Sequence, residues 1–548
     1  MVVAAGSAHA AHAQPVEPEG GASADAAPAP TTSQPSPLAI DQLTLSDDLI
    51  AAVGLRPIGD RRVEARVSTG NDATHQAALR ATDTILGAGL ELTGSALRSD
   101  VLGDQSEAAA RIAHTSDHHV AGLHATYTAD HVGFGRQSFL TDMRTATYGA
   151  AWTESRAPGR VTLELYGEQQ TLRDTRQVGT LELDGSLLGA HVGFTSRSVQ
   201  AFGLDHEFSG DIDVMQANGV ASETDGDPDE MHMTMLPRTR HGRHRFLSAY
   251  IHDTVRVIES LDVHGGFVFE HWRWLTNIAS IYGPDLGESM DQDAAVISSL
   301  MIGPKVGALY RVTPNVAVTA NAYRTLRTPT WQQLMRPVQN GEVVTVADDQ
   351  LHPETVTGAQ LGPTVVTPKL EARVVGFWNE VAAPIADIDV GPAARETTNL
   401  GHAREIGVDA SASWRIAKSV LAGAGYTYTN ARITDAASHP ALAGNVRAQT
   451  PRHRATAALT YDRPTILTVT GTVRFADQRF ANAGNTIALA PVAVVDAMAA
   501  RKLTHGLAGF VSVENIFDRR FVWNQAGVDT IGAPRLVQVG VRLDSARW

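Results

Sequence analysis

The most constraining feature of this sequence is a regular alternation of apolar and polar residues that runs from about Arg61 to the end of the chain. It falls into segments of about 8–12 residues separated by Gly, Pro, Asn or Asp. In ILTVTGTVRF (466–475), the threonines and Arg474 alternate with apolar residues, and REIGVDASASW (404–414) alternates in the same way. Because successive strand side chains point to opposite faces, these segments predict strands with one apolar and one polar face.

Strand length and connection length distinguish a membrane barrel from a soluble sandwich. Many of the segments reach the ~9–11 residues that a tilted membrane strand needs, whereas soluble strands average ~5–6. No run approaches the ~18 consecutive apolar residues of a membrane helix. Short turns at 157–160, 313–315, 462–464 and 504–506 contrast with long polar connections from about Asn218 to Arg245 and from about Arg327 to Pro353. We therefore predict an all-β fold, a large antiparallel transmembrane β-barrel with short periplasmic turns and long extracellular loops.

Composition excludes several other classes of protein. The chain has 548 residues and no cysteine, so neither a disulfide framework nor a cysteine-ligated metal site can form. Its formal net charge of -14 argues against a nucleic-acid partner, which requires a clustered basic surface.

Five segments, in order along the chain, resemble motifs of the TonB-dependent receptors of Gram-negative outer membranes. Each motif is weak alone, but five in the family's order on a chain of barrel texture make a strong resemblance. The overall match covers most of the chain from about residue 90 to 548. The segments are FLSAYIHDTVRVIESLDVHGGFVFEHW (246–272), YRTLRTPTWQQLMRP (323–337), QLHPETVTGAQLG (350–362), NLGHAREIGVDASASW (399–414) and VENIFDRRF (513–521) with the following GAPRLVQVGVRL.

The resemblance implies a barrel of about 22 strands in the cell outer membrane. It also implies a receptor that takes up a large scarce ligand, such as a siderophore–iron complex or a cobalamin-like molecule. The implied partners are outer-membrane lipid, lipopolysaccharide and the barrel assembly machinery. The TonB complex is a partner only if a plug and a TonB box are present.

The amino-terminal region departs from the family pattern. Members carry a plug of well over a hundred residues, but here only residues 1–60 precede the predicted barrel at 61–548. Residues 1–14 contain two A-x-A patterns and resemble a signal-peptide remnant, the alternative being an Ala-rich leader. Residues 15–60, rich in Pro, Ala and Ser, are expected to be a flexible linker or a remnant of the plug region. We therefore expect a receptor that lacks most or all of the plug, either as a truncated and uncoupled gene product or as a plugless relative. The alternatives are a passive porin-like or structural barrel, and a soluble β-rich binder.

Three clusters of polar residues contain side chains that are suited to binding a metal ion or an anion. HTSDHH (114–119) could bind zinc, ETDGDPDEMHMTM (223–235) could bind calcium or a soft metal, and TRHGRHR (239–245) could attract an anionic ligand. In each case a solvated loop or rim is the simpler interpretation, and for TRHGRHR contact with lipopolysaccharide is another.

No nucleophile–base pair, metalloprotease motif or phosphate-binding loop stands in the sequence, so we predict no enzyme, no catalytic residues, no cofactor and no metal site. The ligand-binding residues are not encoded in a readable pattern. The terminal Trp548 is expected to act as a membrane-assembly signal, because the resemblance implies that the assembly machinery reads a terminal aromatic residue.

Overall fold

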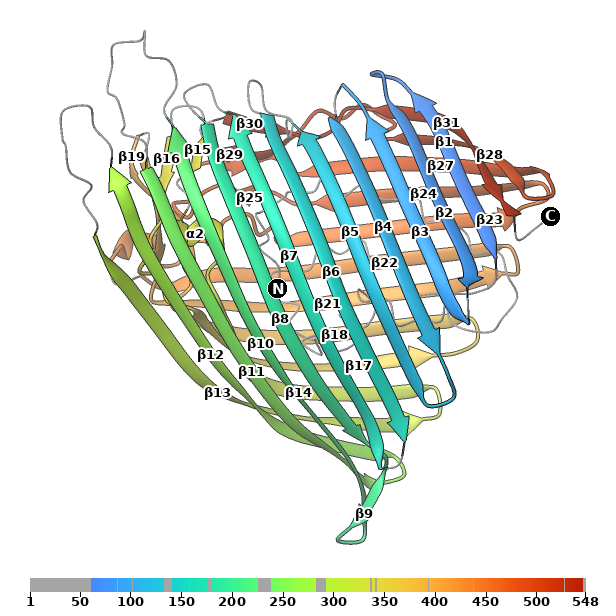
Figure 1. The fold of residues 1–548 in the computed structure, drawn as a ribbon, viewed down its shortest axis with the longest axis horizontal. Helices are drawn as coiled ribbons and strands as arrows, with labels where there is room; N and C mark the ends of the chain where they lie inside the picture. Colours follow the sequence, from blue (N-terminus) through green and yellow to red (C-terminus); the bar gives the residue numbers. More distant parts are fainter. Residues whose placement is uncertain are drawn as a thin grey trace.

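A computed structural model of the chain describes residues 61–545, except 86, 101, 133–139, 157, 176–179, 225–237, 282–291, 336–337, 341–342, 393, 437 and 527. The described residues form a closed barrel of 22 antiparallel strands (Figure 1). One further short strand, β9 (Val199–Ala201), pairs only with β10 and extends a hairpin. No helix among the described residues is long and apolar enough to cross a membrane. The predicted all-β barrel and its strand number are confirmed.

The barrel strands follow one another around the wall in chain order. The first thirteen are β1 (Arg62–Gly70), β2 (His75–Ile85), β3 (Ala88–Arg98), β4 (Asp104–Thr115), β5 (His119–Val132), β6 (Leu140–Arg156), β7 (Gly159–Thr175), β8 (Thr180–Ser196), β10 (Leu204–Thr224), β11 (Arg238–Ile258), β12 (Leu261–Ile281), β13 (Gln292–Thr313) and β14 (Val316–Arg327). The other nine are β17 (Glu354–Val366), β18 (Leu370–Ala382), β21 (His402–Ala417), β22 (Val420–Asp435), β23 (His453–Arg463), β24 (Leu467–Ala476), β27 (Val492–Thr504), β28 (Leu507–Glu514) and β31 (Leu536–Asp544).

The two ends of the barrel differ in their connections. At one end, which we call the short-turn end, most hairpins close over two or three residues, as between β13 and β14 or between β27 and β28. At the other, the long-loop end, the chain runs through 328–353, 383–401, 436–452, 477–491 and 515–535 between neighbouring strands. These connections contain the elements α2 (Trp331–Met335), β15 (Val338–Asn340), β16 (Val343–Val346), β19 (Ile385–Gly391), β20 (Ala394–Asn399), η2 (Pro440–Leu442), β25 (Arg479–Phe480), β26 (Ala488–Leu489), β29 (Val522–Ala526) and β30 (Val528–Ile531).

The height of the wall varies around the barrel (Figure 1). The tall wall, β6–β8 and β10–β13, has strands of 17 to 22 residues. The short wall, made of β23, β24, β27, β28, β31 and β1–β4, has strands of 8 to 13 residues. About 9–11 residues suffice for a tilted strand to cross a bilayer, so the strands of the tall wall are well above that length and those of the short wall are close to it.

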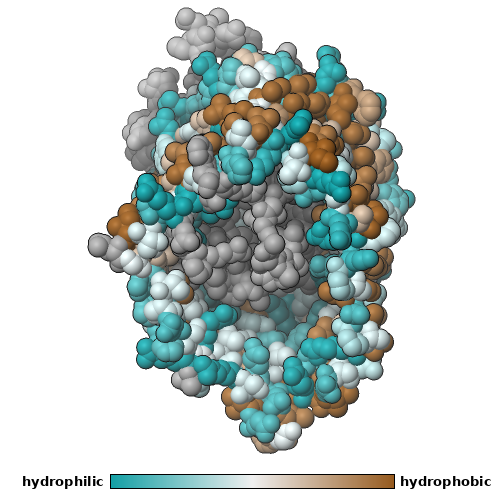
Figure 2. Space-filling view, turned by 90° about the vertical axis from the view of Figure 1, so that its right-hand side faces the viewer, coloured by the Kyte–Doolittle hydropathy of each residue, from teal (hydrophilic) through white to brown (hydrophobic). Residues whose placement is uncertain are grey.

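The outer face of the barrel is apolar, as the alternation predicts. Ile406, Val408 and Trp414 of β21 are each more than a third exposed, and Leu165 of β7 and Leu300 of β13 are 61% exposed. In Figure 2 hydrophobic residues gather mainly along the top and the right-hand side of the ring of side chains. Exposed leucines on a sheet face are expected where that face meets lipid rather than water.

The wall closes where the first strand meets the last. Strand β1 pairs antiparallel with β31, from Glu64 opposite Asp544 to Gly70 opposite Gln538. At this seam Arg62 donates a hydrogen bond from Nη2 to Asp544 Oδ2 at 2.9 Å. The outward positions of β31 include Val539 and Val541, both about half exposed.

The expected long connection from about Asn218 to Arg245 is wrong, because β10 continues to Thr224 and β11 begins at Arg238. TRHGRHR is therefore a strand segment and not a loop. The outward residues of this segment are polar, and they bond across the sheet. Arg245 Nε donates to Gln216 Oε1 at 2.9 Å, and Arg243 Nε donates to Asn218 Oδ1 at 3.0 Å. By contrast, the expected connection from Arg327 to Pro353 is confirmed by the bounds of β14 and β17.

Candidate functional site

The connection 328–353 folds into the barrel and packs on the inner face of the tall wall. Leu334 and Met335 of α2, together with Leu351, are at most 1% exposed, and they join a buried cluster that contains Trp272 and Trp274. A capping box starts α2, since the Thr330 N–H donates to Gln333 Oε1 at 2.9 Å and the Gln333 N–H donates to Thr330 Oγ1 at 3.3 Å. Each large apolar side chain buried in this way stabilises the inward position by about 1.5–3 kcal/mol. We call residues 328–353 the inward loop.

A glycine on β11 makes room for this packing. Gly242 points inward between Trp274 and the inward loop, and a methyl group there would overlap with Trp274 and with the sulfur of Met335. The histidine that follows it inward on β11, His244, is also buried and meets Trp272 edge-on, with ring centroids 5.7 Å apart. Gly242 and His244 of TRHGRHR thus form part of the surface on which the inward loop packs.

A buried ion network anchors the base of the inward loop. Arg327 ends β14 directly opposite Glu354, the first residue of β17, and its Nε donates to Glu354 Oε2 at 2.6 Å. Glu354 is completely buried and also accepts the Ile385 N–H at 2.6 Å. Arg447 lies 3.7 Å from Glu354 and donates to Glu405 Oε1 at 2.6 Å. Two of the resemblance motifs, RTP around Arg327 and PE at Glu354, are therefore joined in space.

A polar cavity of about 420 Å³ lies between several connections at the long-loop end. In its wall Arg395 Nε donates to Asp389 Oδ1 at 2.8 Å, while the side-chain amide of Asn482 donates to the other Asp389 oxygen and to Thr486 Oγ1. The lining combines these polar groups with a few apolar ones: Val343, Asp389, Gly391, Pro392, Ala394, Arg395, Thr486, Ile487 and Gln525. A few convergent polar groups in a largely preformed hollow are typical of a ligand site.

Two arginines lie at the same end, and Asp409 of β21 is the acid that interacts with one of them, Arg454. Arg479 is 4% exposed, donates to the Trp523 carbonyl at 2.6 Å and sits 4.9 Å over the Trp523 ring. Burial lowers the pKa of Arg479, and the positive charge of Arg454 lowers it further. Arg454 occupies the inward position of β23 opposite Thr427 of β22. An anion bound here would offset the cost of burying both charges.

The inner face of the tall wall has the opposite charge. Glu164, His191 and Asp213 stand in one cross-strand row on β7, β8 and β10. Tyr166 donates its hydroxyl to Asp213 at 3.0 Å, and Glu270 of β12 accepts the Leu326 N–H at 3.1 Å. The lumen therefore has an acidic side under the inward loop and a basic side near the short wall.

The polar clusters singled out from the sequence are not all brought into this site. HTSDHH forms the exposed hairpin between β4 and β5 at the short-turn end, with His114 and His119 rings 5.5 Å apart. Most of ETDGDPDEMHMTM, and Trp548, lie outside the described residues. Within the described part of the chain no group of three or more His, Asp or Glu is arranged to hold a metal ion. Sequence reasoning missed Arg395, Arg454 and Arg479, since single arginines carry no spacing signal.

A closed 22-strand barrel with a lipid-type outer face and loops folded into its mouth defines an outer-membrane type of transport protein. The family described as TonB dependent receptor-like, beta-barrel, matches residues 59–516, so the chain belongs to that family. Its members are outer-membrane receptors and transporters and not enzymes.

Solved structures of the same fold include three at low sequence identity. The copper transporter OprC is 17% identical, with a TM-score of 0.73 over 89% of this chain and 83% of that one. The siderophore receptor PiuA from Acinetobacter baumannii is 13% identical, with a TM-score of 0.73 over 89% and 82%. The ferric yersiniabactin uptake receptor FyuA from Yersinia pestis is 15% identical, with a TM-score of 0.72 over 89% and 80%. No curated protein matches the chain.

Proposed function

We propose that this protein is a receptor in the outer membrane of a Gram-negative bacterium that takes up a large, scarce ligand. The long-loop end would face the medium and the short-turn end the periplasm. The observation that carries this proposal is the inward loop, because its buried contacts with Trp272 and Trp274 hold it inside the barrel, where its Val343 lines the polar cavity. The polar cavity beside this loop offers convergent polar groups to a specific ligand.

The ligand class that fits best is an anionic metal chelate such as a siderophore–iron complex. The support comes from Arg454 and Arg479, whose positive charges lie close enough at the long-loop end to interact, with Asp409 as the acid near Arg454. The names of the structural neighbours PiuA and FyuA point the same way, and that of OprC points to copper. A cobalamin-like molecule is the other large ligand that the family resemblance suggests.

Direct binding tests the ligand class. Purified full-length protein is titrated with ferric citrate, a ferric catecholate complex and cyanocobalamin, with quenching of tryptophan fluorescence as the signal. Arg454→Gln with Arg479→Gln should weaken binding of an anionic chelate by about 10–100-fold, the size of one or two charge-assisted hydrogen bonds. Arg501→Gln, on the outer face of β27 near the short-turn end, is the matched control. Equal binding by both variants would contradict the assignment of the arginine pair.

Growth and conductance separate uptake from passive flow. Iron-limited cells that depend on this protein should grow on the chelate only when the TonB complex is intact, provided that residues 1–60 supply coupling. Growth without TonB, together with large open channels in planar bilayers and no chelate binding, would instead identify a passive porin-like barrel.

A further inference from the structure

The hairpin between β4 and β5 brings two histidines together at the short-turn end. His114 lies near the end of β4, His119 begins β5, and the chain reverses direction over the three residues 116–118 between the strands. Their ring centroids are 5.5 Å apart. Two imidazoles on one tetrahedral zinc ion, each at a Zn–N distance of about 2.0–2.1 Å, have their centroids roughly 5 Å apart. The two rings are therefore already close to the separation that one shared ion requires.

Hydrogen bonds fix which nitrogen of each ring carries a proton. Nδ1 of His114 lies 3.1 Å from the carbonyl oxygen of Gly87, which can only accept, so this Nδ1 is the donor. Nδ1 of His119 lies 2.7 Å from Oγ of Ser116, and that hydroxyl donates its own proton to the His119 carbonyl oxygen at 3.4 Å. Nδ1 of His119 is then also a donor. A neutral imidazole has one N–H, so both Nε2 atoms present a lone pair.

This pattern of contacts is typical of histidines that bind a metal ion. A ligating imidazole almost always donates its second ring N–H to an oxygen of the protein or of water, which fixes the tautomer and the orientation of the ring. Ser116 has this role for His119, and it is itself held by the turn, because the N–H groups of His118 and His119 donate to its Oγ at 3.4 and 3.2 Å. The hairpin thus orients the His119 ring before any ion binds.

The other side chains near the pair limit the site to two protein ligands. Glu154 of β6 stands opposite His119 but is ion-paired with Arg156. No group of three or more His, Asp or Glu in the described residues is arranged to hold a metal ion, so water has to supply the remaining ligands. Structural zinc sites have four protein ligands, whereas a site with open positions can exchange its ligands. Imidazole nitrogen suits zinc and copper, while magnesium and calcium take oxygen ligands.

We propose that His114 and His119 reversibly bind one divalent ion of zinc or copper through their Nε2 atoms, with water completing the coordination. This site lies where the sequence alone favours a solvated hairpin and predicts no metal site. It is at the opposite end of the barrel from the polar cavity and the arginine pair. Under the proposed function the short-turn end faces the periplasm, so the ion comes from that compartment, but binding does not depend on the ligand that the receptor takes up.

Chemical modification that is read residue by residue tests the site in the purified full-length protein. Diethyl pyrocarbonate reacts with an unprotonated imidazole nitrogen, and mass spectrometry measures the extent of reaction at each histidine. Equimolar Zn²⁺ should protect His114 and His119 together and leave the reaction of His118 unchanged. Cu²⁺ should protect the same pair at a lower concentration, and Mg²⁺ should protect neither.

Variants of the hairpin separate an oriented site from a chance pair of surface histidines. His114→Ala and His119→Ala should each abolish the tightest phase of Zn²⁺ binding in titration calorimetry. Ser116→Ala keeps both ligands but removes the hydrogen bond that orients one ring, and it should weaken binding by about 10–100-fold. Ser116→Thr, which keeps the hydroxyl, should restore binding. His118→Ala, in the same turn, is the matched control and should bind like the unchanged protein.

Heat-modifiable migration on gels verifies that each variant is folded. The proposal is overturned if the two histidines are not protected together, or if His118→Ala weakens binding as much as His119→Ala does. It is also overturned if Ser116→Ala binds as tightly as the unchanged protein, or if protection appears only at concentrations that protect other exposed histidines equally, which would mean an adventitious ion only. Chelate binding by all of these variants should stay unchanged, so a failure of the proposed function is seen separately.

Discussion

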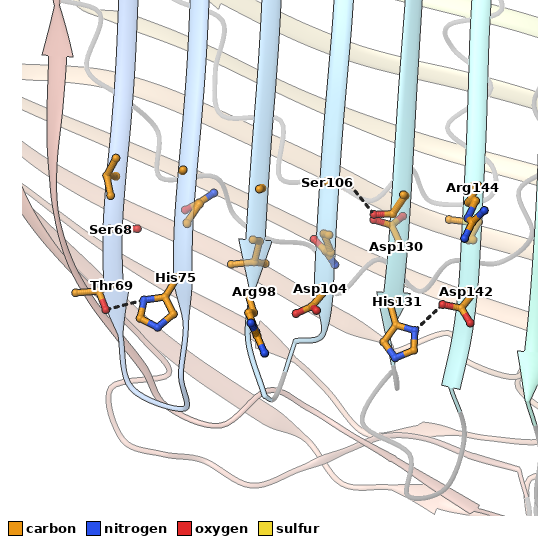
Figure 3. Close-up of a pocket in the computed structure, with 18 residues that line it drawn as sticks. Ser68, Thr69, His75, Arg98, Asp104, Ser106, Asp130, His131, Asp142 and Arg144 are labelled. Carbon is orange, nitrogen blue, oxygen red and sulfur yellow. Dashed lines mark hydrogen bonds and ion pairs between the residues drawn. The ribbon is translucent and has the colours of Figure 1, made fainter.

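The tall wall and the short wall obey the same alternation, yet they use it differently. On the tall wall, strands of 17 to 22 residues exceed the length that a bilayer crossing requires, and their inner face ends in tryptophans that the inward loop covers. On the short wall, strands β1–β4 have 9 to 12 residues, and together with β5 and β6 they carry a hollow of about 660 Å³ on their outer face (Figure 3). The two walls therefore differ in the face that carries their most specific feature, which is a packed loop inside the tall wall and a hollow outside the short wall.

The largest effect should come from removing a tryptophan under the inward loop. Trp274→Ala deletes a completely buried side chain and should lower the free energy of unfolding by about 3–5 kcal/mol. Trp414→Ala, at an outward position that is 50% exposed, is the matched control and should cost far less. Urea unfolding of both variants measures the difference, and protease cleavage within 328–353 should rise only in the first. Similar losses in both would mean that the two faces do not differ in packing.

A second change attacks the base of the inward loop. Glu354→Gln removes the charge that faces Arg327, and it should cost about 2–3 kcal/mol, less than full removal of a buried ion-pair partner because the amide keeps some hydrogen bonds. The exposed Glu371→Gln on β18 should be neutral within about 0.5 kcal/mol. Both are read from urea midpoints at constant m-value. A neutral Glu354→Gln would show that the network does not anchor the loop.

A third change tests the space that the inward loop occupies. Gly242→Val places two methyl groups where Trp274 and Met335 now lie, and overpacking should cost about 1–3 kcal/mol or displace the loop. Gly425→Val, at an inward position of β22 with open space around it, is the control. Single-channel conductance should increase for the first variant and stay constant for the second. Unchanged conductance in both would mean that the inward loop does not obstruct the pore.

The smallest expected effect concerns assembly of the short wall. Deletion of Trp548 should reduce the yield of folded barrel partially, because the last strand still carries outward Val539 and Val541. The yield is measured from the heat-modifiable gel migration of the protein in membrane fractions. Phe517→Ala is the control, because Phe517 is an exposed aromatic residue that follows β28 at the long-loop end. If the yield equals that of the unchanged chain, the terminal tryptophan is not part of the assembly signal.

Alternation in the sequence was sufficient to predict the barrel and the outward faces of β21 and β24, since lipid selects apolar residues at every second position. It could not predict the height of the tall wall. Toward the long-loop end the outward residues of β11 are polar, so TRHGRHR has the composition of a loop although Gly242 and His244 point inward. The composition of a strand reflects the medium around its outward residues. That this segment is a strand follows only from its pairing with β10 and β12.

The site was harder to predict from the sequence, because its contacts join segments that are distant along the chain. The motifs that contain Arg327 and Glu354 were recognised, yet their ion pair follows from the register of β14 and β17. Nothing in the local pattern around Leu334 and Met335 indicates burial against Trp272 and Trp274, which lie more than fifty residues earlier in the chain. The sequence predicts each wall, but the way a loop folds back into the lumen depends on the volume left between the walls.

The seam between β1 and β31 also sets the order of events when the barrel forms. Arg62 and Asp544 are separated by 482 residues, so their contact closes the longest ring in the molecule, while the other barrel strands pair with a neighbour in sequence. Local hairpins can form early, but this contact has to wait until the final strand has been synthesised and exported. Until then the curved sheet presents two unpaired edges that could join with any other strand. The nascent chain therefore needs protection at those two edges above all others.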